Sequence, residues 1–188
     1  SGLGLEAARA LVLKGAHVTI TARKEEKGRK AQIETGAQRV LALDLASLES
    51  IRNAAAQISE DIDVLICNAG VMVTPFRFTK DNFELQMGTN HLGHFAFAGR
   101  LFNQLNNHAR VVSVSSQAHR MGSINPEKII DQCYGRGEYH PWAAYGRSKL
   151  ANLLFTLQLH RLSQSGQLSG DKKLLAVAAH PGYSATNL

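Results

Sequence analysis

The chain has 188 residues, of which 44% are hydrophobic and 19% are charged, a composition that excludes a disordered chain and allows a sizeable core. No apolar run approaches the roughly 18 residues that cross a bilayer, so we expect no membrane segment in the visible chain. With 21 basic and 15 acidic residues the net charge is +6, which favours anionic partners, nucleotides as well as nucleic acids.

The length fits a single domain over residues 1–188. The two cysteines, Cys67 and Cys133, cannot form a disulfide framework and fit a reducing compartment, so we expect a cytoplasmic protein. No secretory signal is visible, and the start at Ser1 resembles a cut in a longer chain more than a natural beginning.

Short runs of β-branched residues alternate with segments of helical periodicity. Nearly continuous apolar character, typical of parallel strands covered on both faces, predicts strands over residues 17–22, 39–43, 62–67, 110–115 and 174–179. Apolar spacings of three and four predict helices from Leu5 to Gly15, from the capping residue Ser47 to Ile58, and over roughly 81–105 and 142–163.

This alternation predicts an α/β fold with a doubly wound parallel sheet in three α/β/α layers. Such a sheet normally carries a strand before the first helix and more chain after the last visible strand. We therefore expect this chain to lack the first strand and the C-terminal end. The stretch over about 117–141, which is rich in Gly and Pro, is predicted to be an irregular loop with a functional role.

One end of the predicted sheet carries features that suit phosphate. Gly2 and Gly4 open a helix, where unpaired N–H groups and the helix dipole attract anions and glycine lets the backbone approach closely, although such glycines also occur in ordinary turns. Two further polar turns follow predicted strands at the carboxyl edge, where open α/β sheets bind ligands: Asp44-Leu45 and Asn68-Ala69-Gly70.

The strand over 17–22 is followed by basic residues. Dinucleotide folds that select NAD place an acidic residue near this point, whereas an arginine accommodates the 2′-phosphate of NADP. No Asp or Glu ends this strand, and Arg23 is followed by Lys24, Lys27, Arg29 and Lys30. The sequence therefore favours NADP, with NAD left open; the same cluster also fits a solvated, basic start of a helix.

The other end carries features that suit proton transfer. Tyr145 and Lys149 are four residues apart and so share one face of a helix, where an ammonium can lower the pKa of a phenol. The spacing alone is weak, but Ser116 ends a strand on the same carboxyl edge, where its hydroxyl can bond a carbonyl or alkoxide oxygen. Asn90 places a polar amide within a packed helix, where it needs partners.

In order and spacing, these residues resemble the short-chain dehydrogenase/reductase family over nearly the whole chain. The motifs are Ser1-Gly2-Leu3-Gly4, Asn68-Ala69-Gly70, Asn90, Ser116, Tyr145-x-x-x-Lys149 and Pro181-Gly182. Three stretches and a long insertion between Ser116 and Tyr145 are most similar to the branch that contains retinol dehydrogenases: Asn90-His-Leu-Gly-His-Phe95, Ser115-Ser-Gln-Ala-His119 and Tyr145-Gly-Arg-Ser-Lys-Leu-Ala-Asn152.

The resemblance implies a Rossmann-type fold and an NADP-preferring oxidoreductase that interconverts an alcohol and a ketone or aldehyde. It implies that Tyr145 is the general acid/base and that Lys149 lowers its pKa and holds the nicotinamide ribose. Ser116 would orient the substrate oxygen, and Asn90 would support a water-linked proton path to Lys149.

For the cofactor, the resemblance implies a contact of the 2′-phosphate with Arg23 and a pyrophosphate wrapped by Ser1, Gly2, Leu3 and Gly4. The adenine would be contacted by Asp44 and Leu45, and its ribose by Asn68, Ala69 and Gly70. The nicotinamide would be bordered by Tyr145, Lys149, Pro181, Gly182 and Thr186. The partner would be a small alcohol or carbonyl compound of unknown identity, and a homo-oligomer is left open.

Two departures and several alternatives accompany this hypothesis. The family's leading Thr-Gly would precede Ser1, and Cys67 replaces the more usual Asn before Asn68. A catalytically silent NADP-binding sensor or scaffold is the alternative function, while nucleic-acid binding lacks a groove-reading motif. His91 and His94 lack a third metal ligand at zinc-like spacing, so we expect packing or hydrogen bonds there and no metal site.

Overall fold

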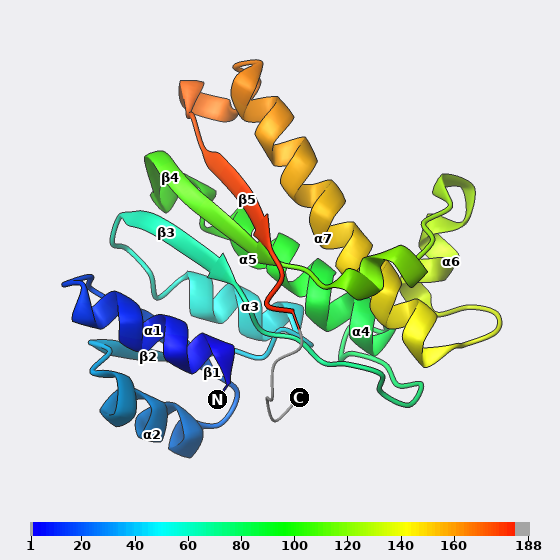
Figure 1. Ribbon diagram of the computed structural model, residues 1–188, viewed down its shortest axis with the longest axis horizontal. Helices are drawn as coiled ribbons and strands as arrows, with labels where there is room; N and C mark the ends of the chain where they lie inside the picture. The colour runs from blue at the N-terminus through cyan, green and yellow to red at the C-terminus, as the bar shows by residue number, and fades with distance from the viewer. Residues whose placement is uncertain (1, 183–188) are drawn as a thin grey trace.

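The computed structural model describes residues 2–182, in which strands and helices alternate along the chain (Figure 1). The strands are β1 (Thr19–Ala22), β2 (Arg39–Ala42), β3 (Ile62–Cys67), β4 (Leu105–Val114) and β5 (Leu175–Ala179). The α-helices are α1 (Leu3–Leu13), α2 (Glu25–Thr35), α3 (Leu48–Ala55), α4 (Leu85–Met87), α5 (Gly93–Arg100), α6 (Ile129–Tyr134) and α7 (Pro141–Gln164). The predicted α/β fold is confirmed.

All strand pairs are parallel, but the described residues form two sheets and not one. β1 pairs with β2, while the second sheet has the order β3-β4-β5. One edge each of β1 and β3 has no partner among residues 2–182, so the expected continuous sheet is not formed by this part of the chain. In the three-stranded sheet Cys67 pairs with Ser113, which pairs with Ala178, so the strands end at a common carboxyl edge.

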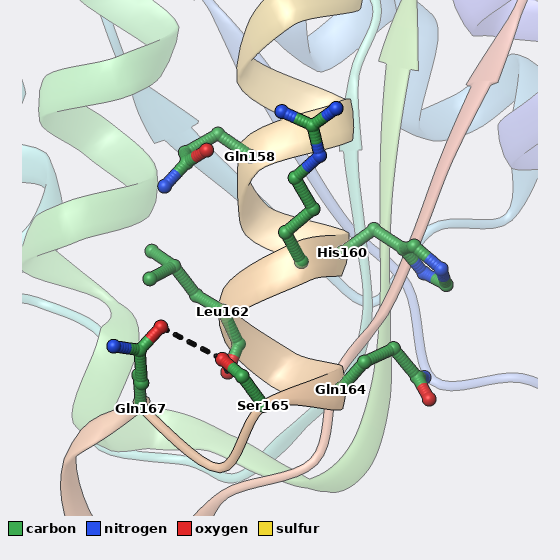
Figure 2. Close-up of a pocket in the computed structure, with 7 residues that line it drawn as sticks. Gln158, His160, Leu162, Gln164, Ser165 and Gln167 are labelled. Carbon is green, nitrogen blue, oxygen red and sulfur yellow. Dashed lines mark hydrogen bonds between the residues drawn. The ribbon is translucent and has the colours of Figure 1, made fainter.

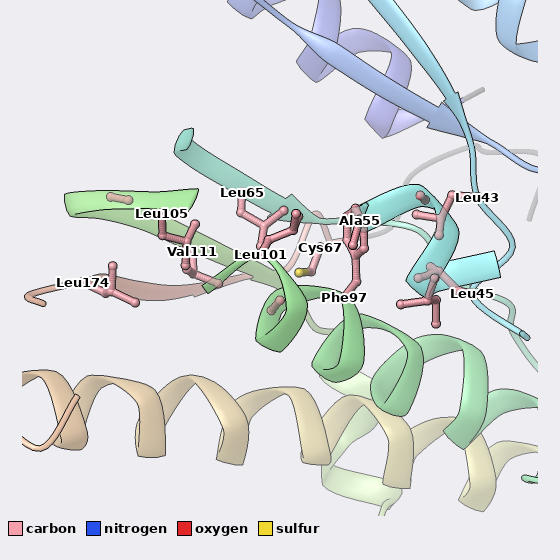
Figure 3. Packing of buried hydrophobic residues seen from close by; sticks show 14 of the residues in the cluster. Leu43, Leu45, Ala55, Leu65, Cys67, Phe97, Leu101, Leu105, Val111 and Leu174 are labelled. Carbon is pink, nitrogen blue, oxygen red and sulfur yellow. The ribbon is translucent and has the colours of Figure 1, made fainter. Parts of the chain in front are cut away.

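The main core lies between the three-stranded sheet and the helices packed on one of its faces. Figure 3 shows this cluster, with α5 and α7 on the same side of the strands. Ile51 of α3 is fully buried, and Leu101 and Val111 are each 1% exposed. Cys67 belongs to this cluster, where burial raises the pKa of its thiol to about 12, as fits a small apolar core residue.

Helix ends follow the predicted signals in the first half of the chain. Ser47 caps α3, because its hydroxyl accepts a hydrogen bond from the Ser50 amide at 3.2 Å. Gly15 follows α1 with φ +83°, the left-handed conformation that ends helices. One predicted strand, over residues 110–115, was too short at its start, because β4 begins at Leu105.

The continuous helix predicted over 81–105 was wrong. The helix begins only at Leu85, because the Glu84 side chain caps α4 by accepting hydrogen bonds from the amides of Gln86 and Met87. The segment Gly88–Leu92 is a π-helix between α4 and α5, and it contains Asn90. Such wide turns are frequent at functional sites, since they turn side chains away from the regular helical register.

The irregular loop predicted over 117–141 was wrong in part. It contains two short 3₁₀ helices, η3 (Gln117–Met121) and η4 (Pro126–Lys128), and the helix α6. Gly135 ends α6 in the left-handed conformation, with φ +64°. Among residues 2–182 there is no helix with the length and apolar character that a membrane crossing requires.

Candidate active site

The predicted chemical pair lies in the first turns of α7. Tyr145 is 7% exposed and Lys149 is 4% exposed, and the Lys149 ammonium lies 5.7 Å from the centroid of the Tyr145 ring. The Lys149 Nζ donates a hydrogen bond of 3.0 Å to the carbonyl of Val114, at the carboxyl end of β4. An ammonium has three donors, so two of them have no partner among residues 2–182.

Burial shifts the pKa values of both members of this pair. Burial raises the pKa of Tyr145 above its ordinary value, and a hydrogen bond with the Ser116 side chain opposes that shift. Burial also lowers the pKa of Lys149 to about 8. Desolvation is therefore the main influence on both groups in the protein alone, and the effect of Lys149 on Tyr145 stays a prediction.

Ser116 reaches Tyr145 because η3 packs directly on the backbone of α7. A side chain on Gly146 would come within 2.5 Å of the Ala118 carbonyl oxygen, and one on Gly122 would meet the Gly146 backbone at 2.3 Å. Ser116 also caps η3, since its Oγ accepts a hydrogen bond from the Ala118 amide at 3.2 Å. Two glycines thus allow the contact that brings the serine to the phenol.

Asn90 is fully buried, and both its Oδ1 and its Nδ2 form hydrogen bonds. Its Oδ1 accepts from the Val71 amide at 2.8 Å, and its Nδ2 donates to the Val71 carbonyl at 2.9 Å. The same Nδ2 donates to Ser148 Oγ at 2.9 Å, and that hydroxyl donates to the Tyr145 carbonyl at 2.7 Å. Asn90 therefore ties the loop after β3 to the turn of α7 that carries Tyr145.

The predicted cofactor turn lies against these groups. A Cβ on Gly70 would stand 3.0 Å from Asn90 Oδ1 and 3.5 Å from Lys149 Nζ. At the other side of the same turn, a Cβ on Gly4 would stand 2.6 Å from Asn68 Nδ2. The structure therefore brings together the start of α1, the turn after β3 and the first turns of α7, as the sequence predicted for Gly4, Asn68, Gly70 and Lys149.

The predicted phosphate contacts lie at exposed positions. Gly2 precedes α1 with φ +61°, and no side chain caps this helix, so its first amides are free to bind an anion. Arg23 is exposed directly after β1 and has no hydrogen bond or ion pair with the residues that the structure describes. Leu3 is the first residue of α1, and Ser1 lies outside the described residues.

The other residues predicted to contact the cofactor, among those that the structure describes, follow β2, β3 and β5. Asp44 accepts a hydrogen bond from the Ala46 amide at 3.0 Å and so shapes the turn after β2, while the Leu45 side chain is buried in the core. Ala69 is exposed in the turn after β3. Pro181 and Gly182 are exposed after β5, and Thr186 lies outside the described residues.

Sequence reasoning missed a group of buried partners around the pair. Ser115 Oγ donates to the Lys149 carbonyl at 2.9 Å, and Asn152 Nδ2 donates to the Val114 carbonyl at 3.2 Å. Ser148 lies three residues after Tyr145, and Asn152 lies three residues after Lys149, so helical spacing could have placed them on the same face. Ser115 carried no comparable signal.

The two histidines of the π-helix region have hydrogen-bonding roles. His94 Nε2 lies 2.8 Å from the Ala69 carbonyl, and burial lowers the pKa of His94 to about 4. The neutral ring must donate at Nε2, because a carbonyl only accepts. His91 Nδ1 lies 3.1 Å from Asn152 Oδ1. Within residues 2–182 no three His, Cys, Asp or Glu side chains are grouped to hold a metal ion.

A separate hollow of about 610 Å³ lies at the far end of α7 (Figure 2). It is lined by residues of the last helical turns and of the segment that follows, and a hydrogen bond of 2.8 Å joins Ser165 to Gln167. Tyr145 lies in the first turns of the same helix, and none of the predicted site residues lines the hollow. It is therefore not part of the candidate site.

The residues at the carboxyl edge fit a nicotinamide dinucleotide. Close backbone approach at Gly4 and Gly70 leaves no room for side chains, as a cradle for a flat, extended cofactor requires. The uncapped start of α1 suits a pyrophosphate, and the two free donors of the Lys149 ammonium suit ribose hydroxyls. Arg23 supplies an exposed cation where an adenosine phosphate would lie.

Comparison with known proteins identifies relatives of one kind. A sequence model described as short chain dehydrogenase matches residues 1–127. The chain is 41% identical over 196 residues to a Streptomyces lividans protein named "Probable oxidoreductase" and 40% identical over 200 residues to human retinol dehydrogenase 11. A solved structure of an uncharacterised protein from Mycobacterium paratuberculosis is similar with a TM-score of 0.87 and 48% identity.

The two named relatives and the solved structure match the whole of this chain, but only part of their own chains is covered. The chain spans 63% of the Streptomyces protein, 59% of retinol dehydrogenase 11 and 67% of the mycobacterial structure. The match to the solved structure shows that the arrangement of strands and helices is shared along the full length of this chain.

Proposed function

The chain belongs to the short-chain dehydrogenase/reductase family, and from that premise we propose that it is an NADP-preferring oxidoreductase that interconverts an alcohol and a ketone or aldehyde. The substrate oxygen would lie between Tyr145 and Ser116. When bound, the nicotinamide supplies the hydride chemistry at the substrate carbon. The chain supplies placement, hydrogen bonds and the proton.

Tyr145 is the proposed general acid/base. In reduction its hydroxyl gives a proton to the carbonyl oxygen as that oxygen gains negative charge, and in oxidation its phenolate takes the alcohol proton. Ser116 donates to the same oxygen and holds it in position. Because burial alone favours the neutral phenol, the proton stays on Tyr145 Oη until the developing charge on the substrate oxygen draws it away.

Lys149 is proposed to hold the ribose and to favour proton transfer from Tyr145. A Cβ on Gly70 would stand 3.5 Å from Lys149 Nζ, so the ammonium, which has two donors without a partner among residues 2–182, lies against the cofactor turn. Asn90 supports this arrangement by fixing Val71 and Ser148, and we propose that it also stands on a water-linked proton path to Lys149.

The observation that carries the proposal is the placement of the Lys149 ammonium 5.7 Å from the Tyr145 ring centroid at the carboxyl edge of the sheet. Both side chains are buried there, and the backbone of the turn at Gly70 approaches the ammonium closely. The preference for NADP is supported by exposed Arg23 and by the absence of an acidic residue at the end of β1.

The decisive experiment compares Tyr145→Phe with Tyr134→Phe, a matched loss of a hydroxyl outside the site. Tyr145→Phe removes the proton donor, so we expect turnover of an alcohol and carbonyl panel to fall by a factor of roughly 10² to 10⁴ while NADPH affinity changes little. Tyr134→Phe retains wild-type turnover. Turnover is followed by nicotinamide absorbance and affinity by fluorescence titration.

Two outcomes contradict the proposal. Retained turnover in Tyr145→Phe removes Tyr145 from the acid/base role. NADPH binding by the wild type with no absorbance change for any substrate of a broad panel favours the catalytically silent sensor instead.

A further inference from the structure

A second buried polar cluster lies next to the candidate site and takes no part in the proposed chemistry. Glu84 and Gln86, at the start of α4, are 1% and 0% exposed, and Tyr139 precedes α7 by two residues. The three side chains join segments that are far apart in sequence: the loop over 71–74, the start of α4 and the end of the insertion before α7.

Gln86 is the bridge of this cluster. Its Oε1 accepts a hydrogen bond from the Val73 amide at 2.8 Å. Its Nε2 donates to the Pro141 carbonyl at 2.9 Å and to the Tyr139 hydroxyl at 2.8 Å. One side chain therefore binds both the loop after β3 and the first residue of α7.

Tyr139 completes the bridge. Its hydroxyl accepts from Gln86 and can donate to the Thr74 carbonyl at 2.9 Å or to Glu84 Oε1 at 3.3 Å. Its ring packs on Phe76, with centroids 5.0 Å apart. Glu84 is held in turn, because its carboxylate accepts the amides of Gln86 and Met87 at 2.8 Å each.

Four hydrogen bonds of 2.8–2.9 Å hold these segments together. On its outer side the cluster borders a cavity of about 460 Å³ lined largely by polar residues, including Glu84 and Tyr139. The first turn of α7 is also held by hydrogen bonds to His140, from the Ala143 amide to Nδ1 at 3.4 Å and from the Ala144 amide to the carbonyl at 2.9 Å. The Gln86 bond to the Pro141 carbonyl adds the tie from this helix start to the loop after β3.

Both ends of the bridge lead to the candidate site. Val73 is two residues from Val71, which Asn90 holds through its amide and carbonyl. Pro141 is four residues, one helical turn, from Tyr145. The bridge thus sets the spacing between the loop that borders the cofactor turn and the helix turn that carries the proposed proton donor.

We propose that Gln86 and Tyr139 are positioning residues for the reaction, a role that rests on the proposed function. They act through α7 and the 71–74 loop and touch neither substrate nor cofactor. Proton transfer is sensitive to small displacements, and a misplacement of about 1 Å far from the chemistry can lower the rate by roughly 10²-fold. Loss of the bridge therefore lowers turnover more than it lowers cofactor affinity.

The test uses Tyr139→Phe, with Tyr134→Phe as control and Gln86→Met as a second variant that removes the bridge itself. Tyr139→Phe keeps the ring on Phe76 and removes one hydroxyl. Tyr134 also packs on a neighbouring ring, that of Phe83 at 5.2 Å, but its hydroxyl has no hydrogen bond within residues 2–182. Each protein is assayed for kcat across pH, for NADPH affinity and for amide hydrogen exchange.

For Tyr139→Phe we expect kcat to fall about tenfold and the limb of the pH–rate profile assigned to Tyr145 to shift, with NADPH affinity within about twofold of wild type. Amide exchange should rise both in the 71–74 loop and in the first turn of α7, because the bridge couples them. Gln86→Met should show the same pattern more strongly, and Tyr134→Phe should match wild type.

A wild-type kcat and pH profile in Tyr139→Phe would overturn the positioning role, whether or not the variant melts at a lower temperature. So would faster exchange in only one of the two segments. The proposed function fails separately, when the wild type shows no turnover or Tyr145→Phe keeps it; the exchange measurement then still decides whether the bridge couples α7 to the loop.

Discussion

The chemical end of the candidate site, around Tyr145, and the phosphate end, around Arg23, differ in how firmly the fold holds them. Lys149 and Asn90 are buried, and three hydrogen bonds of 2.8–2.9 Å fix the Asn90 amide alone. Arg23 is exposed and makes no hydrogen bond or ion pair with residues 2–182, and the start of α1 lacks a side-chain cap.

This contrast corresponds to two different tasks, proton transfer and phosphate binding. Proton transfer requires fixed distances, and Tyr145, Lys149 and Asn90 are accordingly buried. Binding of a charged phosphate requires donors that stay available, and Arg23 accordingly has no partner among residues 2–182. Substitutions at the chemical end should therefore change turnover and stability, whereas substitutions at the phosphate end should change affinity alone.

The largest expected effect is that of Lys149→Met. Turnover should fall by a factor of roughly 10² to 10⁴, because the variant loses the ammonium that favours proton transfer. Stability should rise at the same time by roughly 1 kcal/mol, since Lys149 is buried with a single hydrogen bond and burial lowers its pKa to about 8. Urea unfolding and steady-state kinetics measure the two effects.

Lys172→Met is the matched control. Its ammonium donates to the carbonyls of Phe102, Asn103 and Leu105 at 2.7, 2.9 and 2.6 Å, so the variant should lose stability and keep turnover.

The folded-state pKa of Lys149 lies below its ordinary 10.5, so the wild type should gain stability as the pH rises from about 8 to 10.5. A stability in Lys149→Met below that of wild type would contradict this account.

Gly146→Ala tests the contact that brings Ser116 to Tyr145. The added methyl would lie 2.5 Å from the Ala118 carbonyl and 2.8 Å from the Gly122 amide, both of which are backbone atoms that cannot move independently. We expect a loss of about 1–3 kcal/mol of stability and a lower kcat.

Gly99→Ala is its control, because nothing lies within 4 Å of a Cβ at that position in α5. This variant should gain about 0.5–1 kcal/mol of stability from its higher helix propensity and keep wild-type kcat. Equal kcat in Gly146→Ala and Gly99→Ala would show that the approach of η3 to α7 does not matter for the reaction.

Both ends of the candidate site are predicted by local patterns. Tyr145 and Lys149 were predicted from type and spacing, because the helix period brings residues four apart together, and Asn90 was predicted as a polar amide at a packed helix position. The exposed Arg23 was identified from charge at a strand end, which needs no knowledge of packing. Both signals are local in the sequence, and so both could be recognised.

Contacts between distant segments left no such signal. Gln86 and Tyr139 are 53 residues apart, and nothing in either local pattern indicates their hydrogen bond. The π-helix at Gly88–Leu92 was also missed, since one wide turn scarcely changes the apolar periodicity around it. Desolvation leaves no signal in the sequence either: burial raises the pKa of Tyr145, whereas the local pattern shows only its neighbour Lys149.

The burial of His94, which packs beside the chemical end, makes the stability of the protein depend on pH. Burial lowers its pKa from 6.5 to about 4, so the unfolded chain binds a proton in this range before the folded protein does. The contribution of His94 is complete above pH 6.5 and is lost as the pH falls toward 4, by about 2–3 kcal/mol. His94→Leu should flatten this slope, measured as the free energy of unfolding in urea between pH 4.5 and 7.5.

His160→Gln serves as the control for that slope, because His160 is exposed on α7. It should leave the pH dependence unchanged. His94→Leu also leaves the Ala69 carbonyl without its 2.8 Å donor, so its stability at pH 7.5 should fall by about 1–2 kcal/mol. A slope in His94→Leu as steep as that of wild type would assign the effect to other groups.

The smallest expected effect lies at the phosphate end. Arg23→Ala should weaken NADPH binding about tenfold, the value of one exposed charge-assisted hydrogen bond, and leave NADH binding and kcat unchanged. Paired titrations of both cofactors measure the difference, and Arg29→Ala is the control because Arg29 is exposed but paired with Glu25. Equal losses for the two cofactors would show a role other than 2′-phosphate binding. A wild-type preference for NADH would remove that role altogether, and the phosphate end would then bind through the backbone of α1 alone.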